Sequence, residues 1–261
     1  MIESTVSTIA AQNSPSLQSP LQYVATAVCR PAPTSNRAMD FETARFNMIE
    51  QQIRPWSVLD QDVLDALAAI KREDFVPPAY RAMAFSDLEI PLQIGQDQTG
   101  ELMLAPKMEA RILQALAPRK HEQALEIGAG SGYMAALLAY RAREVISLEI
   151  NPVLSRFAID NIRRAGYSTV KIEQADGANP ADLPGSQWDV ILLSGSIAYL
   201  PNEWLDRLKL GGRLAAIVGQ APVMKAQLIT RIAERAFDTQ TLFETVVARL
   251  HGFPRKSEFT F

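Results

Sequence analysis

Three glycines spaced two residues apart give this sequence its clearest potential for ligand chemistry. They follow a short apolar run, and glycine lets a backbone turn tightly and approach a ligand without a side chain in between. Glu126 stands directly in front of the loop, where a carboxylate suits a positively charged group of the ligand. We expect the whole loop to contact a cofactor, through Glu126, Ile127, Gly128, Ala129, Gly130, Ser131 and Gly132.

Three further signals follow the loop, each at the end of a predicted strand. Glu149 comes about 20 residues later, with Ile150 beside it, and a carboxylate at that distance can accept hydrogen bonds from both ribose hydroxyls. Asp176 and Gly177 follow the next strand, where an aspartate can accept from an adenine amino group and the glycine lets the backbone close on the ring. Ser194 follows the strand after that, where we expect the reactive group of the cofactor.

The spacing of the glycines favours S-adenosyl-L-methionine over the alternative, a nicotinamide dinucleotide. A dinucleotide fingerprint needs a glycine where this chain has Tyr133, and its pyrophosphate needs a crowded glycine turn at a helix N-terminus. S-adenosyl-L-methionine has no phosphate and carries an ammonium and a sulfonium, which match Glu126. The four signals together therefore predict a methyltransferase, and a nicotinamide-dependent dehydrogenase is the competing interpretation.

The elements that position these residues alternate between strand and helix. Asn151 can cap a helix that Pro152 opens and Gly166 ends, and this helix lies between two predicted strands. Such alternation predicts an α/β, Rossmann-like class I methyltransferase fold, with a parallel sheet covered by helices on both faces and the ligand beyond the carboxyl ends of the strands. The predicted strands are 124–127, 144–150, 170–173, 188–193 and 213–218, and helices are expected at 133–140 and 200–208.

Changes in composition and in the hydrophobic pattern divide the chain into three predicted regions. Residues 1–38 are rich in Ser, Thr, Gln, Pro and Ala, which predicts a disordered extension. Residues 39–120 contain apolar residues at helical spacing. Pro55 ends the first predicted helix and Asp60 can cap the second. A loop-rich stretch then runs to Gly100, and Pro106 begins another helix. We expect this region to form a lid over the substrate, and residues 121–261 to form the Rossmann-like core.

Composition argues against several other classes of protein. A net charge of -3 gives no electrostatic case for binding nucleic acid or an anionic membrane, and apolar runs are far shorter than the roughly 20 residues that span a bilayer. The one cysteine, Cys29, can form neither an internal disulfide nor a thiolate zinc site, and we expect no metal. His121 and His251 lie in polar loops without partners at useful spacing. The sequence predicts a soluble, cytoplasmic monomer or weak dimer.

Several motifs between about residues 44 and 254 carry a more specific resemblance. Residues 48–53 read MIEQQI, 72–77 read REDFVP, 90–92 read IPL, 125–133 read LEIGAGSGY and 208–214 read LKLGGRL. In these motifs the chain resembles the protein-L-isoaspartate O-methyltransferases. The resemblance implies protein repair by methyl transfer from S-adenosyl-L-methionine to the carboxylate of an isoaspartyl residue in a protein or peptide.

The sequence departs from this family in the segment expected to meet the substrate. The family carries Gly-Gln-Thr-Ile-Ser, a small residue and Pro, whereas residues 100–106 here read GELMLAP, so Leu102 and Leu104 replace the two hydroxyl residues. A leucine cannot hydrogen-bond a carboxylate, and Thr99 is the nearest hydroxyl upstream. The alternatives are therefore a relative that methylates a different, small or more apolar acceptor, or a non-catalytic cofactor-binding protein.

No catalytic acid or base is assigned from the sequence. A sulfonium is already a strong electrophile and a carboxylate is already ionised at pH 7, so the protein has mainly to align the two and exclude water. The candidates for the substrate loop are Thr99, Leu102 and Leu104, whereas Lys107 and Glu109 on the following helix are expected to be exposed.

Overall fold

The computed structural model describes residues 40–255. The expectation of a disordered extension over residues 1–38 lies outside this part of the chain. No helix within residues 40–255 is long and apolar enough to cross a membrane.

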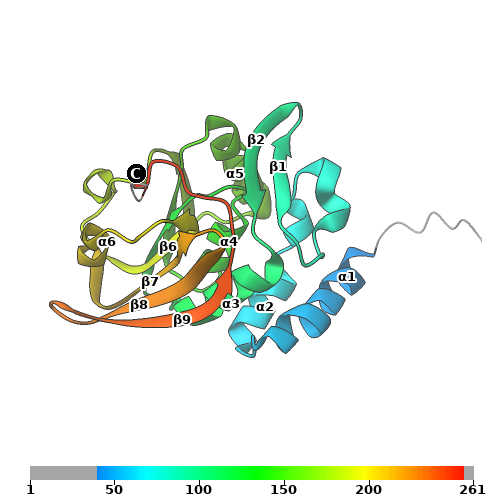
Figure 1. The fold of residues 1–261 in the computed structure, drawn as a ribbon. Helices are drawn as coiled ribbons and strands as arrows, with labels where there is room; N and C mark the ends of the chain where they lie inside the picture. The colour runs from blue at the N-terminus through cyan, green and yellow to red at the C-terminus, as the bar shows by residue number, and fades with distance from the viewer. Residues whose placement is uncertain (1–39, 256–261) are drawn as a thin grey trace, which may run out of the picture. The chain divides into compact units, whose positions relative to one another are not determined.

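A seven-stranded sheet forms the centre of the described part, in the order β5-β4-β3-β6-β7-β8-β9 (Figure 1). The first five strands in sequence are parallel to one another, as predicted. Their bounds are β3 Gln123–Ile127, β4 Glu144–Glu149, β5 Val170–Gln174, β6 Trp188–Ile197 and β7 Leu208–Gln220. After β5 the chain returns to the opposite side of β3, so the strand order reverses between β3 and β6, the place where such sheets open a crevice for a ligand.

Two strands that the sequence analysis did not predict extend the sheet beyond β7. The strands β8 (Val223–Ala233) and β9 (Ala236–Thr245) run antiparallel, β8 to β7 and β9 to β8. The two connections contain only two residues each, which suits hairpins, whereas a parallel return would need a crossover of a dozen residues or more. This hairpin forms the long outer margin of the sheet in Figure 1.

Alternate residues of the central strands serve two different cores. Ala124 and Val190 join the core that packs against the helices from α1 (Phe41–Met48) to α5 (Pro152–Ala165), whereas Leu125 and Ile191 join the core on the opposite face. The second face is covered by the short helix α6 and by a carboxyl-terminal segment that stacks Phe253 on Trp204. The remaining helices of the sheet region are α4 Tyr133–Ala139, α5 Pro152–Ala165 and α6 Asn202–Asp206, the last shorter than predicted.

Residues upstream of the sheet form helices and one hairpin. Asp40 and Asp60 cap α1 (Phe41–Met48) and α2 (Gln61–Ala69), and the chain after α1 continues as a π turn at Ile49–Ile53 and a 3-10 turn at Arg54–Trp56. The stretch predicted to be loop-rich is instead an antiparallel pair, β1 (Ile90–Ile94) and β2 (Asp97–Met103). The sequence analysis did not predict β2 because its residues are mostly polar. Pairing with β1 stabilises the strand. The region also contains short 3-10 helices at Arg72–Asp74 and Pro78–Met83, and it ends with the α-helix α3 (Pro106–Leu116).

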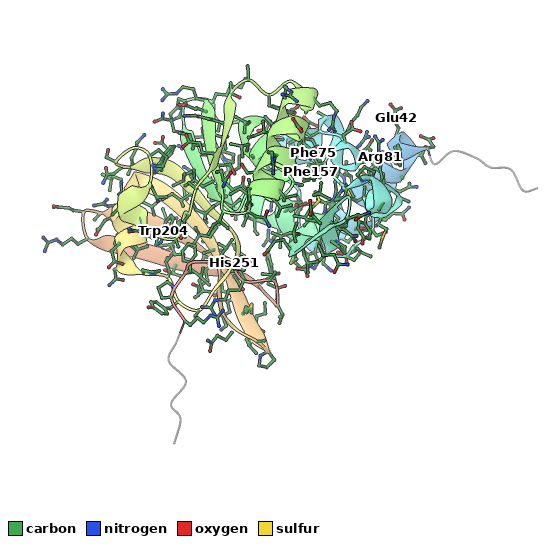
Figure 2. All side chains as sticks on the ribbon, turned by 90° about the horizontal axis from the view of Figure 1, so that it is seen from above. Glu42, Phe75, Arg81, Phe157, Trp204 and His251 are labelled. Carbon is green, nitrogen blue, oxygen red and sulfur yellow. The ribbon has the colours of Figure 1, made fainter. Side chains whose placement is uncertain are left out.

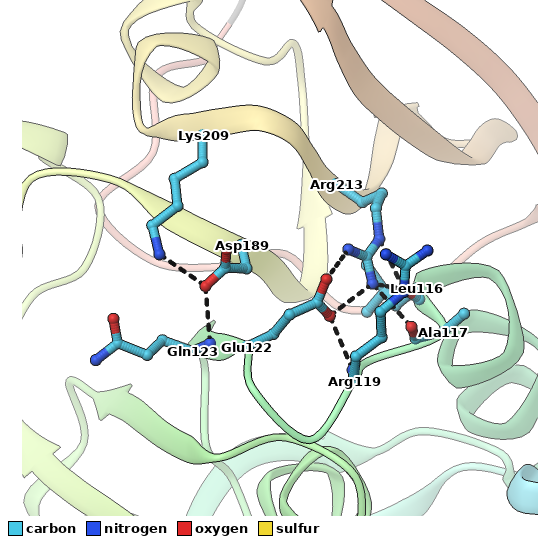
Figure 3. Close-up of polar contacts among 8 residues, drawn as sticks. All are labelled: Leu116, Ala117, Arg119, Glu122, Gln123, Asp189, Lys209 and Arg213. Carbon is cyan, nitrogen blue, oxygen red and sulfur yellow. Dashed lines mark hydrogen bonds and ion pairs between the residues drawn. The ribbon is translucent and has the colours of Figure 1, made fainter.

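An ionic network ties the amino-terminal edge of the sheet to the end of α3 (Figure 3). Arg213 on β7 donates to Glu122 from Nη1 at 2.6 Å and to the carbonyl of Ala117 at 2.8 Å. Asp189 on β6 accepts from Lys209 at 2.8 Å and from the backbone N–H of Gln123 at 2.9 Å. These contacts lie at the opposite end of the strands from the glycine loop and fix the strands in register there.

Candidate functional site

Two adjoining pockets lie at the carboxyl ends of the parallel strands. The outer pocket has about 530 Å³ of empty space, including solvent at its mouth. It is lined by eight of the residues predicted to bind a cofactor: Ile127, Gly128, Gly130, Glu149, Ile150, Asp176, Gly177 and Ser194. The inner pocket shares three of these and adds three more predicted residues: Glu126, Ala129 and Ser131. Tertiary structure therefore brings eleven of the predicted residues together around one continuous site.

The twelfth predicted residue, Gly132, has a different position. It lines neither pocket but forms the N-cap of α4 with φ of +81°. A Cβ atom there would lie 3.3 Å from the carbonyl oxygen of Ala158 and from the side chain of Ile162 on α5. The conformation and the close approach both call for glycine, so the structure gives Gly132 a packing role between two helices.

The glycine loop passes tightly between β4 and the segments that cover it. Gly128 donates its N–H to the carbonyl oxygen of Leu148 at 2.8 Å, and Gly130 donates to Glu149 Oε2 at 2.8 Å. Both glycines have positive φ, and a Cβ on Gly128 would lie 2.8 Å from Leu250. The site therefore has the narrow cradle that only a glycine loop can form.

Glu149 lies at the end of β4, as predicted, and its carboxylate organises the loop. Oε2 accepts from Gly130 N, and Oε1 accepts from Asn151 N at 2.9 Å. Each oxygen keeps a second lone pair that can accept a hydroxyl from a ligand. The side chain is buried, and burial raises its pKa even though the two backbone N–H groups favour the charged form.

Asp176 and Gly177 form the part of the outer pocket that follows β5. Asp176 Oδ1 accepts from the backbone N–H of Ala178 at 2.9 Å, which orients the carboxylate and leaves Oδ2 available to a ligand. A Cβ on Gly177 would lie 2.7 Å from Ile127, so this glycine lets the two strand ends approach each other. The geometry suits an adenine ring between an apolar wall and a carboxylate.

Glu126 is completely buried at the floor of the inner pocket. Ser147 donates its hydroxyl to Oε2 at 2.7 Å, and Ser194 donates to Oε1 at 2.6 Å. Burial raises the pKa of this carboxyl to about 7, and the two serine hydroxyls oppose that rise. Ser194 was predicted to follow its strand, but it lies within β6, which extends to Ile197, and its hydroxyl supports Glu126.

Glu109 is a site residue that the sequence interpretation missed. It was expected to be exposed, but it is only 3% exposed, lines the inner pocket and forms an ion pair with Arg72. Arg72 is fully buried, donates to the carbonyl oxygens of Ala84 and Leu104, and lies 4.9 Å from the centre of the Tyr133 ring. One signal was available: position 109 falls on the same helical face as the buried residues 112, 113 and 116.

His251 and Glu101 form a second contact that spacing could not reveal. His251 Nε2 lies 2.7 Å from Glu101 Oε1, although the residues are 150 positions apart, and both line the outer pocket. Figure 2 labels His251 on the carboxyl-terminal segment. The expectation that this histidine lacks a partner is therefore wrong. With Leu92 and Leu250, which also line the outer pocket, the pair closes the β1–β2 hairpin against the carboxyl-terminal segment.

The three substrate-loop candidates have different environments. The Thr99 hydroxyl donates to the carbonyl oxygen of Leu92 at 2.7 Å within the hairpin, and the residue lines neither pocket. Leu102 lines both pockets, and Leu104 lines the inner one. The segment therefore presents apolar side chains to the site, and the only proton of the Thr99 hydroxyl is already used inside the hairpin.

The residues present fit S-adenosyl-L-methionine. The loop offers a cradle without side chains, Glu149 and Asp176 offer acceptors for ribose hydroxyls and an amino group, and Glu126 offers a buried anion for a cationic end. When bound, this cofactor supplies an electrophilic methyl group. Nothing in the arrangement calls for the phosphate contacts that a dinucleotide would need.

Comparison with known proteins supports the same interpretation. Residues 43–250 match the family model described as Protein-L-isoaspartate(D-aspartate) O-methyltransferase (PCMT). The protein-L-isoaspartate O-methyltransferase of Petrotoga mobilis is 33% identical over 196 residues, covering 75% of this chain and 90% of that protein. Protein-L-isoaspartate O-methyltransferase 1 of Syntrophobacter fumaroxidans is 36% identical over 193 residues, covering 73% and 86%.

A solved structure shares the fold. The crystal structure of a protein from Plasmodium falciparum, described as a protein-L-isoaspartate O-methyltransferase in complex with S-adenosyl-L-homocysteine, aligns with a TM-score of 0.64 at 21% identity. The alignment covers 80% of this chain and 97% of that one. It confirms the predicted class I methyltransferase fold.

Proposed function

The chain belongs to the protein-L-isoaspartate(D-aspartate) O-methyltransferase family, and we propose that it methylates the carboxylate of isoaspartyl residues in damaged proteins or peptides. It is an S-adenosyl-L-methionine-dependent methyltransferase. The observation that carries the proposal is the family match over residues 43–250, which spans the hairpin, the glycine loop and every residue that lines the two pockets except His251. The acceptor comes from the names of the relatives.

We assign the cofactor contacts from the lining of the two pockets. In this assignment the Glu149 carboxylate accepts hydrogen bonds from the ribose hydroxyls, and the Asp176 carboxylate accepts one from the adenine amino group. Gly128 and Gly130 let the backbone approach the cofactor closely. Glu126 faces the cationic end. Each of these carboxylates is already oriented by backbone or hydroxyl donors, so little ordering remains to be done on binding.

Methyl transfer needs alignment and a dry site more than proton transfer. The acceptor carboxylate is already ionised at neutral pH. Leu92, Leu102 and Leu250 cover the glycine loop, which limits the access of water to the reacting groups. We therefore assign no general base, and the protein contributes by holding donor and acceptor in line.

We also propose that residues 39–120 act as the lid over the substrate. The supporting contacts come from the β1–β2 hairpin, since Leu92, Glu101 and Leu102 line the outer pocket. The hairpin meets the carboxyl-terminal segment through Glu101 and His251. This contact places the hairpin and the carboxyl-terminal segment side by side at the outer pocket, which supports a covering role for the hairpin.

A transfer assay with radiolabelled S-adenosyl-L-methionine tests the function. One peptide carries an isoaspartyl residue, and its control carries aspartate at the same position. We expect label to enter the isoaspartyl peptide selectively. Tight cofactor binding without transfer to either peptide would overturn the proposed acceptor, and would point to a family member that methylates another group.

A further inference from the structure

Two carboxylates from different elements share the floor of the inner pocket. Glu109 belongs to α3 and Glu126 to β3, and the two side chains are 3% and 0% exposed. Both line the inner pocket beside Gly128, Gly130 and Ser194, which also line the outer pocket. The carboxylates therefore lie beside the part of the glycine loop that the two pockets share.

The charges around this pair do not balance when both carboxylates are ionised. Arg72 is ion-paired with Glu109, whereas Glu126 receives only the hydroxyls of Ser147 and Ser194. The other charged groups that act here do not supply the missing cation: Glu149 adds a negative charge near Glu126, and Arg45 is ion-paired with Glu73. One buried negative charge is left over.

A buried charge without a partner is unfavourable, and the carboxyl groups can remove it by taking up a proton. Burial raises the pKa of Glu109 to about 7, against the opposing effect of Arg72. Burial likewise raises the pKa of Glu126 to about 7, and the charges of Glu149 and Glu109 add to that rise. Near neutral pH the empty pair therefore exchanges protons with solvent.

We propose that Glu109 and Glu126 form a charge-sensing seat for the methionine end of the cofactor, holding one proton when empty and releasing it to solvent when S-adenosyl-L-methionine binds. The methionine end carries an ammonium, a carboxylate and a sulfonium, so its net charge of about +1 compensates the ionised pair. S-adenosyl-L-homocysteine lacks the sulfonium and its methionine end is neutral. The pair thus favours the charged methyl donor over the demethylated product, which assists product release.

This inference rests on the cofactor of the proposed function and is independent of the identity of the acceptor. The first experiment is calorimetry of the full-length protein with each ligand at pH 6.5, in two buffers that differ in ionisation enthalpy. We expect S-adenosyl-L-methionine to release roughly half to one proton per site, and S-adenosyl-L-homocysteine to release close to none. This measurement needs no variant and so does not depend on how a substitution folds.

The second measurement is affinity between pH 6 and 7. Release of one proton from a group with a pKa of about 7 predicts that S-adenosyl-L-methionine binds about fivefold more tightly at pH 7 than at pH 6. The affinity for S-adenosyl-L-homocysteine should change by less than about twofold. The range ends at pH 7 because α-amino groups of the ligands titrate above it.

Three substitutions locate the effect. Glu109→Gln should lower proton release and bring the affinities for the two ligands closer together. Glu101→Gln and His251→Gln are matched controls, because they alter the Glu101–His251 contact in the lining of the outer pocket and should leave proton release intact. The histidine control also removes an imidazole that lines the outer pocket.

The possible results separate this inference from the proposed function. Binding of S-adenosyl-L-methionine without proton release, or an equal pH dependence for both ligands, would overturn the charge-sensing seat and leave the cofactor assignment standing. Loss of proton release in His251→Gln, with release retained in Glu109→Gln, would also overturn it. Failure of either ligand to bind would overturn the cofactor assignment together with the seat.

Discussion

The Glu149 carboxylate accepts backbone hydrogen bonds and also lines the proposed cofactor pocket. Its oxygens accept from the backbone N–H groups of Gly130 and Asn151, and they line the pocket where we place the ribose. The same side chain therefore shapes the glycine loop and, in our proposed assignment, contacts the ribose. A substitution here should affect binding through both routes.

Replacing Glu149 by Ala should weaken binding of S-adenosyl-L-methionine at least about tenfold, or roughly 1.4 kcal/mol, because a charge-assisted acceptor and the anchor of Gly130 are lost together. Calorimetry gives the affinity. Glu173→Ala is the control, since Glu173 on β5 pairs with the exposed Lys171 and lines neither pocket. Unchanged affinity in Glu149→Ala would contradict the ribose assignment.

Leu102 and Leu104 allow a test of how the proposed acceptor is recognised. They stand where the family resemblance leads us to expect hydroxyl residues, and they present apolar surface to the pockets, so an acceptor carboxylate gains no hydrogen bond from them. The double substitution Leu102→Thr and Leu104→Ser should raise kcat/KM for an isoaspartyl peptide several-fold. Thr99→Val is the matched control, because its hydroxyl is engaged with Leu92 inside the hairpin. If the double variant gains nothing, these positions do not limit acceptor recognition.

At the scale of elements, the two ends of the parallel strands have different roles. The network of Arg213, Glu122 and Asp189 lies at the amino-terminal ends of the strands, and the glycine loop and the pockets lie at their carboxyl-terminal ends. Arg213 also donates to the carbonyls at the end of α3, the helix that bears Glu109. Stability and ligand binding thus depend on opposite ends of the same strands.

Arg213→Met should lower the free energy of unfolding by about 3 kcal/mol, because it leaves the buried Glu122 without its cation. Lys209→Met removes a partly exposed ion pair of the same network and should lower that free energy by less than about 1 kcal/mol. Urea denaturation of both variants makes the comparison. Equal effects would mean that burial of the Arg213 pair is not what matters.

At the scale of the whole molecule, burial and ion pairing shift the pKa values of four carboxyl groups in opposite directions. Burial raises the pKa values of Glu109 and Glu126 to about 7. Burial also acts against the charged forms of Glu122 and Asp189, but hydrogen bonds from Arg213 and from Gln123 and Lys209 outweigh it and lower their pKa values. The raised and the lowered pKa values therefore bias stability in opposite directions as pH changes.

The free energy of unfolding of the ligand-free protein should fall as pH rises from about 5 to 8. Glu109 and Glu126 hold protons in the folded state at pH values where the unfolded chain has lost them, so folding becomes less favourable as pH passes through about 7. Below about pH 4 stability falls again, as Glu122 and Asp189 become protonated. Urea denaturation across this range gives the curve, and Glu126→Gln should flatten its neutral limb. A steady rise from pH 5 to 8 would contradict the assignment.

Removing residues 1–38 should leave both the melting temperature and the affinity for S-adenosyl-L-methionine unchanged. The family match begins at residue 43, and the core begins on α1, where Asp40 provides the N-cap. Thermal unfolding and calorimetry of the shortened chain, beside the full chain, provide the measurement. A fall of several degrees in melting temperature would show that the segment contributes to the fold.

What the sequence determined was the part of the site that depends on local order along the chain. Glycines fix the loop, parallel strands bring their carboxyl ends to one edge, and Glu149 and Asp176 follow such strands directly. Their convergence follows from the topology of alternating strands and helices. The same rule could not assign Gly132, which stands inside the motif but packs against α5.

Only the tertiary structure decided the contacts between distant segments. The ion pair of Arg72 with Glu109, and the meeting of Glu101 with His251 across 150 positions, depend on how the amino-terminal region and the carboxyl-terminal segment fold over the sheet. The raised pKa of Glu109 has the same origin, because desolvation reflects everything that packs around a group. The helical face that Glu109 shares with residues 112, 113 and 116 could have indicated its burial, but no pattern along the chain could reveal its pairing with Arg72.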